Sequence, residues 1–158
     1  MNLKIIIILT NNPFCSSSAS ANRWLALIEG LAFLQVRAHL IVCGGFISVE
    51  EIKNFGNKGV YKNISYEYIR PIVVQGYWKV RYHNYIGQVL RNGRILKELQ
   101  KRLSNESGII WTDASPLSYR FAEALKRTNP QAKLFIEMSE FLDIHQYNKG
   151  NFLQRLIS

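Results

Sequence analysis

The loop between the first apolar segment and the first predicted helix holds small polar side chains that could bind a ligand. Residues 3–9 read LKIIIIL, and the loop 10–18 that follows reads TNNPFCSSS. Its candidate binding residues are Asn12, Ser16, Ser17 and Ser18. Small residues ahead of a helix N-terminus let an anionic group approach free backbone N–H groups. The alternative role of these residues is to form a capped surface loop.

Acidic side chains follow two later strands. Asp113 comes after the apolar segment 108–111, and Glu137 and Glu140 come after the segment 132–136. In an open parallel sheet, the carboxyl ends of the strands form the edge that binds ligands. We therefore expect these carboxylates to accept hydrogen bonds from sugar hydroxyls, with capping and solvated charge as the alternative.

A long predicted helix, residues 77–103, presents a cationic face. Its polar side holds seven Lys and Arg residues and a single acid, Glu98. The members that we expect at an anionic membrane surface are Arg91, Arg94, Lys97 and Lys101. Lys and Arg attract anionic lipids, and the Tyr and Trp residues at the start of this helix suit the headgroup region. The alternative is a cationic face that is only solvated.

Composition and spacing narrow the classes of partner. The net charge of +9, from 20 Lys and Arg against 11 Asp and Glu, favours an anionic partner. No RNA- or DNA-binding motif is present, so nucleic acid is not a predicted partner. The three histidines and two cysteines have no metal-ligand spacing, and no metal site is predicted. The loop 10–18 has neither a GxGxxG nor a GxxxxGK(S/T) motif, which argues against tight binding of a dinucleotide or a nucleoside triphosphate.

Strand-like and helix-like segments alternate along the chain. Apolar runs typical of strands occur at 3–9, 40–43, 64–69, 108–111 and 132–136. Helices are predicted from Ala19, capped by Ser17 or Ser18, over 77–103, and from Pro116, capped by Ser115; 49–62 is predicted as a short helix and a loop. The alternation predicts a doubly wound α/β fold with a mainly parallel sheet of five or more strands, and residues 1–158 are predicted to form one domain.

The first residues of the chain and its cysteine content predict where in the cell the protein is found. Residues 1–9 hold one lysine and an isoleucine run, but no small-residue cleavage site follows directly. We interpret this stretch as a first strand rather than a signal peptide. Two cysteines without a paired motif suit a reducing compartment. The expected location is the cytoplasm, with peripheral attachment to the inner face of the membrane through the cationic helix.

Four segments carry a resemblance to a known family. They are the strand 5–9 with the serines 16–18, ANRWLAL at 21–27 with AHLIV at 38–42, WTDASP at 111–116, and IEMSEF at 136–141. In these segments the chain resembles the N-terminal half of glycosyltransferases of the GT-B fold, most of all the retaining group called glycosyltransferase family 4. The resemblance covers nearly the whole chain and implies a Rossmann-like domain.

The resemblance implies an activity of the hexosyltransferase type: transfer of a sugar from a nucleotide-sugar to an acceptor hydroxyl, with retention and without a bound metal. The context implied is cell-surface polysaccharide or glycolipid synthesis. This chain corresponds to the acceptor-side domain, so a sugar or lipid-linked acceptor is expected at the polar residues named above: Asn12, Ser16, Ser17, Ser18, Asp113, Glu137 and Glu140.

The resemblance also implies a division of labour between two domains. The family's donor-binding domain is C-terminal, so the nucleotide-sugar is expected there and no cofactor is expected on this domain. The chain alone is then expected to be inactive and to need that domain as its partner. The first loop is Ser-rich where the family often has two glycines, and Asp113 stands where several members have a histidine. The alternative is a non-catalytic Rossmann-like or flavodoxin-like binding domain.

Overall fold

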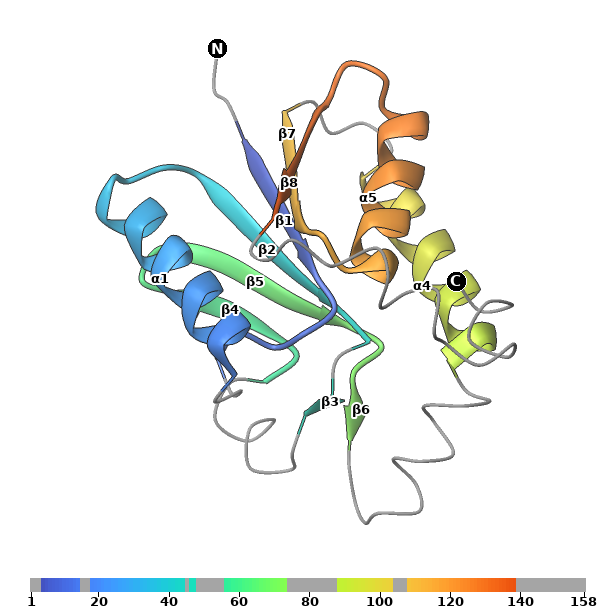
Figure 1. Ribbon diagram of the computed structural model, residues 1–158, viewed down its shortest axis with the longest axis horizontal. Coiled ribbons are helices and arrows are strands. Elements are labelled where there is room, and N and C mark those ends of the chain that lie inside the picture. The colour runs from blue at the N-terminus through green and yellow to red at the C-terminus, as the bar shows by residue number, and fades with distance from the viewer. Residues whose placement is uncertain are drawn as a thin grey trace.

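A mixed six-stranded sheet with helices on both faces forms the centre of the molecule (Figure 1). The computed structural model describes residues 4–14, 18–44, 46–47, 56–73, 88–103 and 108–138. The strands of the sheet are β1 (Ile5–Leu9), β2 (Ala38–Cys43), β4 (Lys58–Tyr61), β5 (Ile64–Ile69), β7 (Ile109–Asp113) and β8 (Lys133–Glu137). The described helices are α1 (Ala19–Phe33), α4 (Gln88–Leu103) and α5 (Pro116–Thr128). A separate two-stranded sheet pairs β3 (Phe46–Ile47) with β6 (Ile72–Val73).

The strand order explains where a ligand site belongs. The sheet runs β4-β5-β2-β1-β7-β8, and every pair is parallel except β4 with β5. Numbered along the chain, the five parallel strands therefore lie in the order 3-2-1-4-5. The order reverses between β1 and β7, and in open α/β sheets ligands bind outside the carboxyl ends of strands at such a reversal. The predicted doubly wound, mainly parallel fold is confirmed.

The central strand β1 explains the unbroken apolar run at the chain start. All five of its residues are at most 9% exposed. Ile6 and Ile8 pack with α4 and α5, whereas Ile5, Ile7 and Leu9 pack with α1. Successive side chains of a strand point to opposite faces, so a strand that is covered on both faces needs apolar residues at every position.

The two helix caps that the sequence predicts are found. The hydroxyl of Ser18 accepts a hydrogen bond from the backbone N–H of Ala21 and caps α1. Ser115 caps α5 in the same way through the N–H of Ser118, and Pro116 occupies the first turn. Each cap satisfies one of the backbone donors that a helix start leaves unpaired.

The structure corrects the segment 49–62, which the sequence predicts as a short helix and a loop. Its residues 58–61 are instead the edge strand β4, antiparallel to β5; residues 49–55 lie outside the described ranges. The connecting residues Lys62 and Asn63 both have positive φ, 45° and 69°. That backbone makes a tight two-residue hairpin, but a turn of this kind normally carries glycine, and its absence hides the hairpin in the sequence.

One further boundary differs from the sequence prediction, and another lies outside the described residues. The strand expected to end at Trp111 continues through Thr112 and Asp113, and the Thr112 hydroxyl donates to the carbonyl of Ile8 on the neighbouring strand. Of the predicted helix 77–103, the structure describes only residues 88–103, which are helical. Within the described ranges, no helix combines the length and the apolar character needed to cross a membrane.

Replacing Leu99 with alanine should test the packing of α4 against the sheet. Leu99 is fully buried, so Leu99→Ala should lower the free energy of unfolding by about 2–5 kcal/mol. The control is Phe33→Ala on α1, where the ring is 87% exposed and the expected change is below about 0.5 kcal/mol. Urea unfolding measures both, and equal effects of the two substitutions would contradict the described packing.

Candidate functional site

Hydroxyl and carboxylate groups meet where the strand order reverses. Asp113 is the last residue of β7, and its Oδ1 accepts hydrogen bonds from the Ser115 backbone N–H at 3.1 Å and the Ser115 hydroxyl at 2.7 Å. The hydroxyls of Ser115 and Ser118 lie 2.8 Å apart. Thr10, just after β1, places its hydroxyl 3.2 Å from that of Ser118. This network joins the carboxyl ends of β1 and β7 to the start of α5.

Asn12 lies at the same carboxyl edge of the sheet and contacts Tyr68 of β5. It is 6% exposed, and its Oδ1 accepts from the Phe14 N–H and from the Tyr68 hydroxyl, both at 3.1 Å. A backbone N–H can only donate, so the oxygen of the amide must face Phe14. The other amide atom, Nδ2, is buried and has no partner within the described part of the chain. A buried donor without a partner costs about 1–3 kcal/mol, and a ligand oxygen can relieve that cost.

The other sequence-predicted residues of this edge are placed as follows. Glu137 ends β8 opposite Asp113 in the strand register, and one of its oxygens lies 3.9 Å from Nε of Arg23 on α1. Ser18 is exposed and serves as the α1 cap. Ser16, Ser17 and Glu140 lie outside the described residues. The structure therefore brings Asn12, Asp113 and Glu137 to one edge, together with Thr10, Ser118 and Tyr68, which the sequence did not single out.

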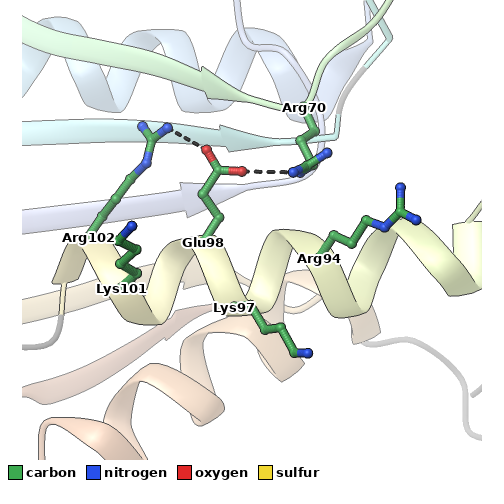
Figure 2. A pocket seen from close by; sticks show the side chains of 6 residues that line it. All are labelled: Arg70, Arg94, Lys97, Glu98, Lys101 and Arg102. Carbon is green, nitrogen blue, oxygen red and sulfur yellow. Dashed lines mark hydrogen bonds and ion pairs between the residues drawn. The ribbon is translucent and has the colours of Figure 1, made fainter.

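The cationic helix face divides into neutralised and free charges. Arg70, Arg94, Lys97, Glu98, Lys101 and Arg102 line an open hollow of about 620 Å³. Figure 2 shows Arg70 and Arg102 pointing toward Glu98, which forms ion pairs with both, while Lys97 points away. Among the described residues, Arg94, Lys97 and Lys101 take part in no ion pair, and all three are exposed. Arg91, predicted for the same face, is instead partly buried beside Gly44.

A second polar cluster lies in the other half of the sheet. His39 on β2 places Nδ1 2.7 Å from the Ser65 hydroxyl and Nε2 3.2 Å from a carboxylate oxygen of Glu67, both on β5. These are the groups of a serine hydrolase triad. However, the Ser65 hydroxyl also lies 3.4 Å from the Ala38 carbonyl, and Glu67 forms an ion pair with Arg102 of α4. Ser65 and His39 line no part of the hollow beside α4. The contacts of this cluster instead connect β2, β5 and α4.

Neither a metal-binding cluster among the described residues nor a match to a known protein helps to identify this site. Within the described ranges, no three His, Cys, Asp or Glu side chains gather closely enough to hold a metal ion. No protein-family model matches the chain, and no curated protein or solved structure matches it. The interpretation of the site therefore rests on its geometry and on the resemblance noted in the sequence.

Removing the Ser115 hydroxyl should show how much the hydrogen-bond network at the point where the strand order reverses stabilises the fold. Ser115→Ala deletes the cap of α5 and one of the donors to Asp113, and we expect a loss of about 1–2 kcal/mol in unfolding free energy. Ser115→Thr keeps the hydroxyl and should retain most of that stability. Thermal and urea unfolding compare the variants, and an alanine variant as stable as wild type would contradict the network.

Proposed function

We propose that this chain is the acceptor-side domain of a glycosyltransferase, which moves a sugar from a nucleotide-sugar to an acceptor hydroxyl. The observation that carries the proposal is the unpaired, buried Nδ2 of Asn12 at the sheet edge where strand order reverses. Carboxylate and hydroxyl groups surround the same edge. Sugars present many hydroxyl groups, which both donate and accept, and a mixed set of amide and carboxylate partners suits them.

Each polar residue has a distinct role in this proposal. Asn12 donates from Nδ2 to an acceptor oxygen, while Tyr68 and Phe14 hold its amide in place. Asp113 uses Oδ1 for Ser115, and Oδ2, which no other described residue contacts by a hydrogen bond, accepts from an acceptor hydroxyl. Glu137 accepts from a second hydroxyl. Holding the acceptor in this way fixes the attacking hydroxyl relative to the donor sugar, which lowers the entropic part of the barrier.

The donor belongs to a second domain in this proposal. In the resembled family that domain is C-terminal and grips the nucleotide-sugar, and the active cleft forms between the two halves. The loop 10–18 lacks the glycine-rich phosphate motifs, which supports a division of roles in which this chain does not bind the donor by itself. The competing interpretation, a non-catalytic α/β binding domain, shares the ligand edge but predicts no sugar transfer.

Substitution of Asn12 in a protein that includes the expected donor-binding domain tests the activity. Nucleotide release from UDP- and GDP-hexoses, with a membrane or polysaccharide extract as acceptor, should be at least about tenfold slower in kcat/KM for Asn12→Ala. This corresponds to about 1.4 kcal/mol of lost transition-state binding. His39→Gln, in the other half of the sheet, is the control and should keep the rate. If none of these mixtures releases nucleotide, the non-catalytic alternative is favoured. Equal rates for wild type and Asn12→Ala would instead remove Asn12 from the acceptor site.

We also propose that the free cations of α4 dock the protein on the inner face of an anionic membrane. Arg94, Lys97 and Lys101 are exposed and unpaired among the described residues, and each cation near an anionic bilayer contributes about 1 kcal/mol. Three contacts give about 3 kcal/mol, which makes docking weak, reversible and sensitive to salt. Lipid-linked acceptors, common in the resembled family, would give this docking a use.

Sedimentation with vesicles tests the docking surface. Wild-type protein should pellet with vesicles that contain phosphatidylglycerol, less so at high salt, and not with pure phosphatidylcholine. Reversal of Arg94, Lys97 and Lys101 to glutamate should abolish pelleting. The matched control reverses Arg37, Lys58 and Lys133, which are exposed on other parts of the surface and change the net charge equally. Equal losses in the two triple variants would show that net charge, rather than this face, controls binding.

A further inference from the structure

Arg91 occupies a position of α4 that its helical spacing reserves for apolar side chains. Ile95, Leu99 and Leu103 follow at intervals of four residues and are all buried against the sheet. Residues four apart share one face of a helix, so Arg91 faces the sheet as they do. Its Nε and Nη1 atoms are buried, and neither has a hydrogen-bond partner in the part of the chain that the structure describes.

The backbone at the end of β2 makes room for this guanidinium. Gly44 follows β2 with a φ of +65°, and its N–H donates to the carbonyl of Ile69 at the end of β5. A Cβ added at Gly44 would lie 3.2 Å from Nε of Arg91 and 2.9 Å from Cδ1 of Ile95. A side chain at position 44 would therefore crowd Ile95 and Arg91, and the positive φ also favours glycine there. The guanidinium lies at the carboxyl edge of the sheet, the edge that also holds Asn12.

The charge of Arg91 lacks a counterion among the described carboxylates. Each of the six has another partner: Glu29 with Lys62, Glu67 and Glu98 with Arg102, Asp113 with Ser115, Glu123 with Arg127, and Glu137 with Arg23. Burial lowers the pKa of Arg91, but an arginine remains protonated in proteins. A partly buried cation without a counterion is destabilising, and departures of this kind from packing rules are expected at functional sites.

We infer that Arg91, seated against Gly44, binds a phosphoryl group at the carboxyl end of β2. A guanidinium presents its N–H donors in a planar fork that suits phosphoryl oxygens, and binding an anion there would neutralise the partly buried charge. The anion site rests on the geometry of Arg91 alone. Its assignment to a phosphoryl group rests on the proposed function, in which lipid-phosphate acceptors and nucleotide-sugars both carry that group.

The stability of an Arg91→Met variant distinguishes a ligand site from an internal ion pair. Methionine fills the apolar stripe without a charge, so in phosphate-free buffer Arg91→Met should unfold at a higher temperature than wild type. Inorganic pyrophosphate, at constant ionic strength, should raise the unfolding temperature of wild type and of the control Arg37→Met, an exposed arginine with no role in either proposed site, but not of Arg91→Met. A lower unfolding temperature for Arg91→Met, with an unchanged response to pyrophosphate, would overturn the inference and indicate an internal partner.

Binding measurements then identify the source of the phosphoryl group. Calorimetry on wild type should detect geranyl phosphate or uridine monophosphate, with at least tenfold weaker binding to Arg91→Gln and unchanged binding to the control Arg37→Gln. Tighter binding of geranyl phosphate assigns the site to a lipid-phosphate acceptor. Tighter binding of uridine monophosphate assigns it to the donor and would reject the proposed division of roles, in which this chain does not bind the donor by itself. Equal affinities of wild type and Arg91→Gln for both probes would overturn the site. Arg91-dependent binding in a protein that transfers no sugar would leave the phosphoryl site standing and reject the proposed function.

Discussion

The double burial of β1 is the constraint on which the rest of the structure depends. This strand pairs with β2 on one side and β7 on the other, so both of its edges are used by backbone hydrogen bonds. Both of its faces are covered, by α1 and by α4 with α5. Polar side chains can then appear only where the strand ends. At its carboxyl end the chain passes directly into Thr10 and Asn12, at the point where strand order reverses. The fold thus places its polar groups at one edge because it admits them nowhere else along this strand.

The polar groups around His39 and those at the carboxyl edge of the sheet differ in whether they have hydrogen-bond partners. In the half that contains His39, the imidazole, Ser65, Glu67 and Arg102 form a connected set of partners that stabilises the contact between strands and α4. At the carboxyl edge, by contrast, Asn12 and Arg91 each keep buried donors without a partner among the described residues. Local rules of packing are commonly broken at functional sites, where a ligand completes what the protein leaves open. Both the proposed acceptor site and the proposed phosphoryl site follow from this asymmetry.

The sequence predicts well those features that depend on neighbouring residues. The buried run of β1 and the caps at Ser18 and Ser115 are local patterns, and all are found. The sequence does not predict the strand β4, because Lys62 and Asn63 form its turn without glycine. The pairing of His39 with Ser65 depends on strand register, and the bond from Tyr68 to Asn12 joins residues 56 positions apart. The charge of Arg91 predicts a place on the outer face of the helix, whereas its spacing from Ile95 and Leu99 puts it in the apolar stripe. Features set by long-range contacts or by burial of a charge could not be derived from local patterns.

The central claim is that the carboxyl edge of the sheet binds a hydroxylated, phosphorylated ligand. Titration of ¹⁵N-labelled protein with glucose 1-phosphate, followed by amide NMR, tests it most directly, because the probe carries both kinds of group. The account predicts shifts that saturate together at the amides of Asn12, Gly44 and Asp113, with the amides of His39 and Ser65 unchanged. An absence of saturable shifts at millimolar probe, or shifts confined to the half of the sheet that contains His39, would contradict it.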